Sequence, residues 1–414
     1  MPSRREAWVI KKISVQDLRI GMFIHDLNAG WMDHVFFRSR FMLRKEEDLQ
    51  KIQTSGIREL YIDTVKGMDL PEAPTQTEVQ EQLMQGMLRG AQRPARAQTT
   101  HREELAYAKA VRAEADHVIR GVLADARLGK QAQVEQVEPV VAEITDSILR
   151  NPGTLVSLLR LREGDNYTFT HCVSVATLLV TFGRHLGMDR SQLMELGVGG
   201  MLHDLGKMRV PDHILNKPGK LTNEEFEIMK QHVDLGMQLL RSTPGITPAM
   251  AQIAGEHHER FGGAGYPDGL HGFQISASGR MAAIVDVYDA ITSNRIYHRG
   301  MEPSVALQKI FEWSEHHFDP ELAQQFIQAV GIYPVGSLVR LESQRLAVVV
   351  DLGEGSLLNP VVRVVYDARR RKPLEPQDLD LSRAEHGGDH IIGHELPGDW
   401  NIDPFSFLTL DIGL

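Results

Sequence analysis

Seven metal-ligand residues in the middle of the chain constrain its fold more than any other feature. They are five histidines and two aspartates: His171, His203, Asp204, His232, His257, His258 and Asp286. Imidazole and carboxylate groups bind hard and borderline divalent cations in proteins. Asp286 lies within an apolar run, where a buried charge is costly unless a cation or another charge compensates it. The fold must therefore bring separate segments together around a common centre.

The segments that carry these residues have helical patterns with recognisable starts. Thr222 and Glu225 form a capping box that opens the helix with His232. Pro248 suits the first position of the helix that ends at His257. Each ligand thus lies on a helix or at the end of one, and a helical bundle with a dinuclear centre in its core accommodates this arrangement.

Changes in pattern along the chain predict a mainly α protein with five segments. Residues 1–70 form a small α+β domain. Residues 71–101, rich in Gln, Pro, Ala and Gly, are interpreted as a linker. Residues 102–153 form a helical connector, either a signalling helix or a helix packed on the next domain. Residues 154–332 form the helical domain with the metal-type residues, and residues 333–414 form a β-rich appendage.

Composition excludes several classes of protein. The net charge of −10 disfavours nonspecific binding of nucleic-acid polymers. The single cysteine, Cys172, excludes an intrachain disulfide framework and fits a reducing compartment. Neither a signal peptide nor an apolar stretch long enough to span a bilayer is found, so the sequence predicts a cytoplasmic protein without membrane insertion.

The number of ligands favours two metal ions over one. Seven candidates exceed what a single tetrahedral catalytic metal needs, and a carboxylate such as Asp204 can bridge a pair. Ligands without thiolate suit Fe, Mn, Ni or Zn, and the residue types do not choose among them. A metal pair that activates water and offsets charge at phosphorus predicts phosphoester hydrolysis.

Residues beside the ligands are candidates for substrate contacts. Lys207 is expected to stabilise phosphate charge or protonate the leaving group, the alternative being a solvated cation. Arg295 is a candidate phosphate clamp. The loop 262–269 has four glycines that let its backbone approach a ligand, and Tyr266 within it is expected to stack on a base or bind phosphate. The alternative is a plain connection between helices.

Two motifs resemble those of the HD-GYP family, phosphodiesterases of the HD superfamily that hydrolyse cyclic di-GMP. They read His203-Asp204-x-Gly206-Lys207 and His257-His258-Glu259-x-x-x-Gly263-x-Gly265-Tyr266-Pro267. The resemblance covers about residues 154–330 and implies an HD-type bundle in which the seven residues bind metal. It also implies catalytic roles for Asp204 and Lys207, and substrate contacts for Gly265, Tyr266, Pro267 and Arg295. The N-terminal part resembles a poorly characterised domain often found ahead of HD-GYP domains in bacteria.

The chain departs from the family pattern at two positions. Some members have a glutamate four residues before the first histidine and bind three metals, whereas this chain has Tyr167 there. Two metals are therefore predicted, and Tyr167 is expected to hydrogen-bond a ligand or close the pocket. Some members also have a phosphate-binding lysine three residues after the arginine, where this chain has His298.

The residues and the resemblance together predict an enzyme that hydrolyses cyclic di-GMP to linear pGpG and then GMP. Its cofactor is expected to be two divalent transition metal ions, Fe or Mn ahead of Ni or Zn. One alternative is a catalytically weak cyclic di-GMP receptor that signals through its N-terminal domain. A second is a hydrolase of ordinary nucleotides or of another cyclic dinucleotide. A homodimer and a signalling-protein partner are both left open.

Overall fold

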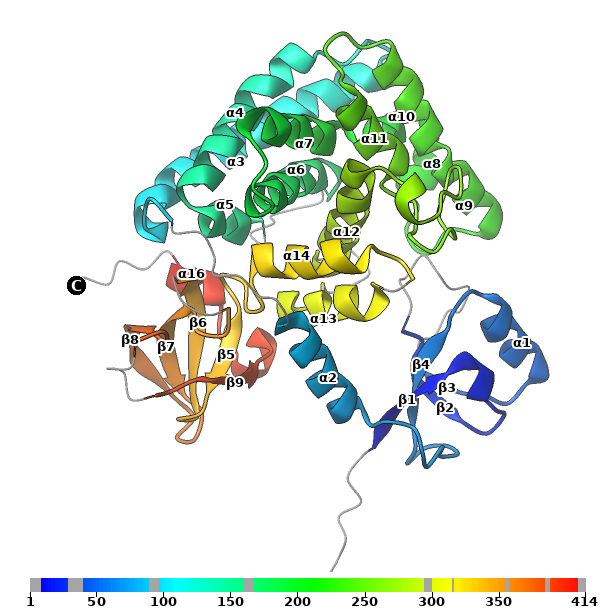
Figure 1. Cartoon of the computed structure of the whole chain (residues 1–414), viewed down its shortest axis with the longest axis vertical. Coiled ribbons are helices and arrows are strands. Elements are labelled where there is room, and N and C mark those ends of the chain that lie inside the picture. The colour runs from blue at the N-terminus through cyan, green and yellow to red at the C-terminus, as the bar shows by residue number, and fades with distance from the viewer. Residues whose placement is uncertain are drawn as a thin grey trace, which may run out of the picture. The chain divides into compact units, whose positions relative to one another are not determined.

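The computed structural model describes residues 9–28, 40–88, 97–159, 167–293, 300–314, 316–353, 357–383 and 388–408, with Tyr167 described by its backbone alone. The chain divides into two compact units, Met1–Arg89 and Gly90–Leu414, and each is described by itself. Figure 1 labels the elements of both units.

The first unit is a small antiparallel sheet with helices. Its strands are β1 (Ile10–Ser14), β2 (Phe23–Asp26), β3 (Phe41–Met42) and β4 (Glu59–Asp63), in the order β1-β4-β2-β3. The 3-10 helix η1 (Val15–Asp17) and α1 (Glu46–Thr54) lie between strands. Ile24, Ile52 and Leu60 are fully buried in its core. Helix α2 (Gln76–Leu88) contacts β1 and lies within the stretch 71–101, so part of that stretch is helical.

The second unit begins with a bundle of helices. Its elements are α3 (His101–Arg127), α4 (Val134–Arg150), α5 (Pro152–Leu158), α6 (Tyr167–His185), α7 (Arg190–Leu202), η2 (Leu205–Arg209), α8 (Asp212–Leu215), α9 (Asn223–Lys230), α10 (His232–Arg241), α11 (Pro248–Glu256), η3 (Gly272–Gln274), α12 (Ala277–Thr292), α13 (Pro303–Trp313) and α14 (Pro320–Val330). The predicted capping box of Thr222 and Glu225 is confirmed, as is Pro248 in the first turn of its helix.

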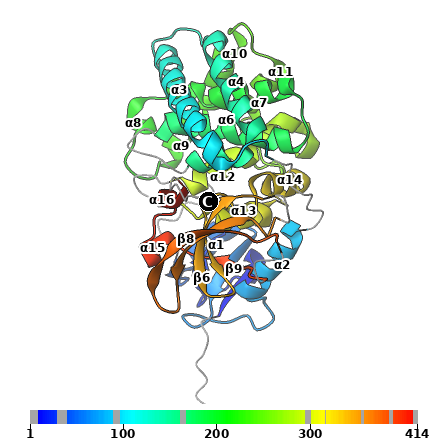
Figure 2. The ribbon, with the colours of Figure 1, turned by 90° about the vertical axis from the view of Figure 1, so that its left-hand side faces the viewer.

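Helices α3 and α4 belong to the core of this bundle. Val111 and Ile119 of α3 and Val141 and Ile144 of α4 are buried in one apolar cluster with Leu205 and residues of α6, α7 and α11. Figure 2 shows α3 and α4 running along the bundle beside α6 and α7. Of the two interpretations of residues 102–153, the structure has the one in which the helices pack on the next domain.

Helices α6 and α12 are buried on nearly every side. From His171 to Phe182 every residue of α6 is buried, and so is every residue of α12 from Met281 to Ile291. A helix that is apolar all round belongs in the interior of a domain. The two helices pack against each other, so a polar side chain on either one is enclosed by the bundle.

The second unit ends in an antiparallel sheet. Its strands are β5 (Leu338–Leu341), β6 (Arg345–Asp351), β7 (Val361–Asp367), β8 (Lys372–Asp380) and β9 (Ile391–His394), in the order β8-β7-β6-β5-β9. Two short helices follow, α15 (Pro397–Trp400) and α16 (Pro404–Leu408). The predicted fold class is confirmed: a mainly helical domain with an α+β N-terminal unit and a β-rich C-terminal part. Among the described residues, no helix has the length and apolar character needed to cross a membrane.

Candidate metal centre

The structure brings all seven predicted ligands to one buried centre. His171 comes from α6 and Asp286 from α12, while the others lie at the ends of α7, α10 and α11. All seven side chains are buried. Their ligand atoms form three overlapping groups, each within 4.8 Å: His232 with His257 and His258, His171 with His203 and Asp286, and His203 with Asp204 and His257.

A glycine permits the close approach that assembles part of this centre. The turn after Asp204 runs into η2, which lies directly against the start of α10. A Cβ atom at Gly206 would lie 1.9 Å from the carbonyl oxygen of His232, and it would also clash with the backbone of Gly236. Only glycine therefore lets this turn lie against the first residue of α10.

Backbone carbonyls orient three of the imidazoles in the same way. The Nδ1 atoms of His203, His232 and His257 lie 2.8, 2.7 and 2.9 Å from the carbonyl oxygen of the residue three positions earlier. A carbonyl oxygen only accepts, so each Nδ1 carries the hydrogen and each Nε2 keeps its lone pair. Fixing the tautomer in this way is a common device of metal-binding histidines.

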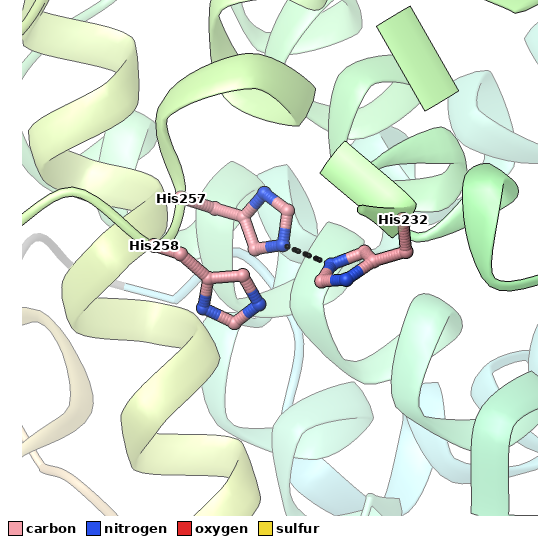
Figure 3. A group of neighbouring side chains, drawn as sticks. All are labelled: His232, His257 and His258. Carbon is pink, nitrogen blue, oxygen red and sulfur yellow. Dashed lines mark hydrogen bonds between the residues drawn. The ribbon is translucent and has the colours of Figure 1, made fainter. Parts of the chain in front are cut away.

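The inward-facing nitrogens lack a proton that could join them. Figure 3 shows the rings of His232, His257 and His258 converging, with the Nε2 atoms of His232 and His257 at 3.5 Å. Burial lowers the pKa of His232 to about 4 and that of His257 to about 3, so both rings are neutral at pH 7. Two lone pairs that face each other need a cation between or beside them.

Further ligand atoms in the centre also lack partners. His203 Nε2, Asp204 Oδ1 and His258 Nδ1 are buried and accept or donate no hydrogen bond within the described part of the chain. Buried polar atoms in folded proteins are nearly always satisfied. Nitrogen and oxygen donors whose free atoms all face one point fit divalent metal ions, so the residues present are compatible with a metal centre.

Asp204 lies between the two groups of histidines. Its Oδ1 is 3.5 Å from His232 Nε2 and 3.7 Å from His257 Nε2, and its Oδ2 is 3.3 Å from His203 Nε2. Oδ2 also accepts a hydrogen bond of 2.5 Å from Lys207 Nζ. Burial alone would raise the pKa of Asp204, but His203 and Lys207 hold it well below its usual range. The carboxylate is therefore charged and placed where it could bridge two cations.

Asp289 is a member of the centre that the sequence analysis missed. It follows Asp286 by one turn of α12, and its Oδ2 lies 2.7 Å from Nδ1 of His171. Nε2 on the far side of the same ring lies 3.0 Å from Asp286 Oδ1. Burial would lower the pKa of His171, but the two carboxylates raise it to about 9. The i, i+3 spacing of the two aspartates was the one available signal.

The glycine-rich loop lies against the centre. Tyr266 stacks on the ring of His258, with centroids 4.6 Å apart and planes at 28°. The Glu259 carboxylate accepts hydrogen bonds from the N–H groups of residues 268–270 and so fixes the loop. A Cβ atom at Gly265 would lie 2.3 Å from the backbone nitrogen of Arg260, so this glycine lets the loop fold back on itself.

The other predicted site residues are described in part or not at all. Lys207 lies at the centre beside Asp204, as given above. Pro267 follows Tyr266 in the loop through a cis peptide bond. Tyr167 is the first residue of α6, one turn before His171, and only its backbone is described. Arg295 and His298 lie outside the described residues.

Two family models match the chain. One is described as an HD domain and covers residues 148–322. The other is described as a domain of unknown function, DUF3391, and covers residues 10–137. The second match therefore extends beyond the first unit and takes in α3 of the bundle.

Three curated proteins are similar to the chain. Cyclic di-GMP phosphodiesterase PA4108 of Pseudomonas aeruginosa is 41% identical over 394 residues, which cover 95% of this chain and 94% of the relative. A cyclic di-GMP phosphodiesterase of Vibrio cholerae is 38% identical over 42% of this chain and 38% of its own. The 3'3'-cGAMP-specific phosphodiesterase 2 of Vibrio cholerae is 35% identical over 39% of this chain and 31% of its own.

Proposed function

The chain belongs to the family of HD-domain cyclic di-GMP phosphodiesterases, and we infer from this membership that it hydrolyses a phosphodiester bond of cyclic di-GMP. The inference rests on the relative that matches both units of the chain, from the N-terminal sheet to the C-terminal one. The observation that carries it within the molecule is the buried centre itself, in which seven histidines and aspartates expose unpaired donor atoms to a common point.

We propose that this centre holds two divalent metal ions. One group of ligands is His232, His257 and His258, the other is His171, His203 and Asp286, and Asp204 lies between them. When bound, such a pair supplies an activated water and positive charge for an in-line displacement at phosphorus. Nitrogen and oxygen ligands without thiolate suit Fe and Mn, and also Ni and Zn.

The chain's own residues contribute charge and positioning. We propose that Lys207, held by Asp204 and one-fifth exposed, stabilises the phosphate charge or protonates the oxygen that leaves. Tyr266 and the backbone at Gly265 and Pro267 border the centre and are proposed to contact the nucleotide. Arg295 is proposed as a second phosphate contact from its sequence position alone.

The proposed first product is linear pGpG. Water adds to one phosphorus, one P–O bond of the ring breaks, and the leaving oxygen takes a proton to become a hydroxyl group. A second hydrolysis of the same kind would release GMP. The alternative that the residues leave open is a receptor that binds cyclic di-GMP at the same centre and releases it unchanged.

The experiment that tests the proposed function measures metal content, binding and hydrolysis of cyclic di-GMP on the full chain. We expect the wild type to hydrolyse cyclic di-GMP, and Asp204→Asn to lose turnover to background while its circular dichroism is unchanged. Asp234→Asn, at an exposed aspartate of α10, is the matched control. Near-normal turnover in Asp204→Asn with unchanged metal content contradicts the assignment. Tight binding without turnover in the metal-loaded wild type would favour the receptor.

A further inference from the structure

A basic and aromatic cluster borders the metal centre at the loop. It consists of Phe226 and Lys230 of α9 together with Tyr266, and it is called the α9 cluster below. The Lys230 ammonium lies 5.5 Å from the centroid of the Phe226 ring and 5.7 Å from that of Tyr266. The two rings meet edge to face, with centroids 6.3 Å apart. Cation–π contacts of this kind hold an ammonium group in place over the rings.

The α9 cluster is connected to the centre on two sides. The Tyr266 ring stacks on His258, one of the candidate ligands. Lys230 lies two residues before His232, and the carbonyl oxygen of Met229 accepts the hydrogen bond from His232 Nδ1. The segment that orients His232 therefore also sets the position of the Lys230 side chain.

The ion pair that Lys230 makes is one that an anion can replace. Its partner is Glu227 at 2.7 Å, one turn earlier on the same helix. The Glu227 side chain is 68% exposed, whereas the Lys230 side chain is 27% exposed. An exposed i, i+3 pair contributes little to stability, because both charges are well solvated when apart. Lys230 thus keeps a positive charge close to the centre that the fold does not need for itself.

We propose that Lys230 binds the phosphate of cyclic di-GMP that is not being hydrolysed. This inference rests on the proposed function. The substrate has two phosphodiester groups in one ring, so a molecule with one phosphate at the metal ligands and Lys207 must place the other further out. The α9 cluster holds an ammonium group beside that region, and ammonium is a compact charge suited to phosphate. Lys230 would then select cyclic dinucleotides over substrates with a single phosphodiester.

Two substrates distinguish this role from a structural one. Cyclic di-GMP has a second phosphate, whereas bis(4-nitrophenyl) phosphate has one phosphodiester and no second charge. We expect Lys230→Met to raise KM for cyclic di-GMP about tenfold, the loss of one charge-assisted hydrogen bond, with kcat within about twofold of wild type. The value of kcat/KM for bis(4-nitrophenyl) phosphate should be unchanged. Lys230→Arg should keep most of the affinity, because it keeps the charge.

The matched control is Lys309→Met, which removes a lysine that forms an equivalent i, i+3 pair with Glu312 on α13. An equal loss on both substrates in Lys230→Met would overturn the inference, because it would mean that Lys230 supports the loop. An unchanged KM for cyclic di-GMP would overturn it as well.

Titration calorimetry with cyclic di-GMP separates this inference from the proposed function. A wild type that binds cyclic di-GMP without hydrolysing it contradicts the proposed enzyme. In that case a tenfold weaker binding by Lys230→Met still supports Lys230 as the phosphate contact, and equal binding by the two proteins overturns it. A wild type that does not bind cyclic di-GMP overturns both proposals.

Discussion

The Nδ1 atom of His171 lies 2.7 Å from a carboxylate oxygen of Asp289, on the side of the ring that faces away from the candidate metal ligands. This pairing leaves Nε2 of His171 directed at Asp286 and Asp204, at 3.0 and 3.6 Å. A carboxylate behind a metal-binding imidazole fixes the ring orientation and raises its basicity. Asp289 is therefore a positioning residue for the half of the centre built on α6 and α12.

Asp289→Asn should weaken metal binding with little change in fold. Asparagine retains the shape of the side chain but removes the charge that favours a basic imidazole, and loss of such a partner typically costs about 10- to 100-fold in metal affinity. Competition with a chelator, followed by measurement of bound metal, gives the affinity. Asp234→Asn serves as the control for removal of one negative charge. Wild-type affinity in Asp289→Asn would assign Asp289 a purely structural role.

Tyr266→Ala should impair handling of substrate more than binding of metal. The tyrosine contacts His258 through its ring face and lies on the loop, and no metal-type atom of its own faces the centre. We expect a higher KM for cyclic di-GMP with bound metal unchanged, and Tyr266→Phe should retain the stacking and most of the affinity. Phe273→Ala, at an exposed aromatic residue just after the loop, is the control. Loss of metal or of folding in Tyr266→Ala would make the loop structural.

A fragment that begins at residue 97 should fold and retain some hydrolysis, whereas one that begins at residue 152 should not fold. The second fragment lacks α3 and α4, which bury Val111, Ile119, Val141 and Ile144 in the bundle core. Each buried apolar side chain of this size contributes about 1.5 to 3 kcal/mol. The loss of two such helices is therefore comparable with the whole stability of a domain, about 5 to 15 kcal/mol.

Circular dichroism and thermal melting of both fragments, with a hydrolysis assay of the first, check this prediction. A folded and metal-loaded but inactive 97–414 fragment would indicate that the N-terminal unit completes the site. A cooperative melting transition in the 152–414 fragment would show that α3 and α4 are dispensable.

Much of the centre could be predicted because its chemistry is written in residue types. Histidine and aspartate at helix ends are rare enough together that His203-Asp204 and His257-His258 mark a metal site without any structure. Helix starts were equally legible, because a capping box such as that of Thr222 and Glu225 is a local hydrogen-bond pattern.

The remaining features depend on tertiary contacts that no local pattern encodes. An aspartate one turn after Asp286 could equally have faced solvent, so only packing against α6 identifies Asp289 as the partner of His171. The amphipathic stripe of α3 fits a dimer stalk as well as a bundle, and burial of Ile119 in the bundle core decides between them. Lys230 has an ordinary surface pattern, and its proximity to Tyr266 arises from a contact between α9 and a loop more than thirty residues later.

The centre should bind two metal ions per chain and not three. The seven candidate ligands lie in two groups joined by Asp204, and a third ion would need further oxygen ligands beside His171. The residue one turn before His171 on α6 lies on the same face of the helix. That residue is Tyr167, a neutral phenol with a pKa near 10 that binds divalent ions poorly in competition with carboxylates. Tyr167→Glu places a carboxylate at this position and should admit a third ion. The measurement is the metal-to-protein ratio, with anomalous scattering to locate the ions, on wild type and variant purified without air or chelator. A wild-type ratio close to three, with an ion next to Tyr167, would contradict the two-metal centre. A ratio of two in both proteins would instead mean that this face of α6 is not directed at the centre.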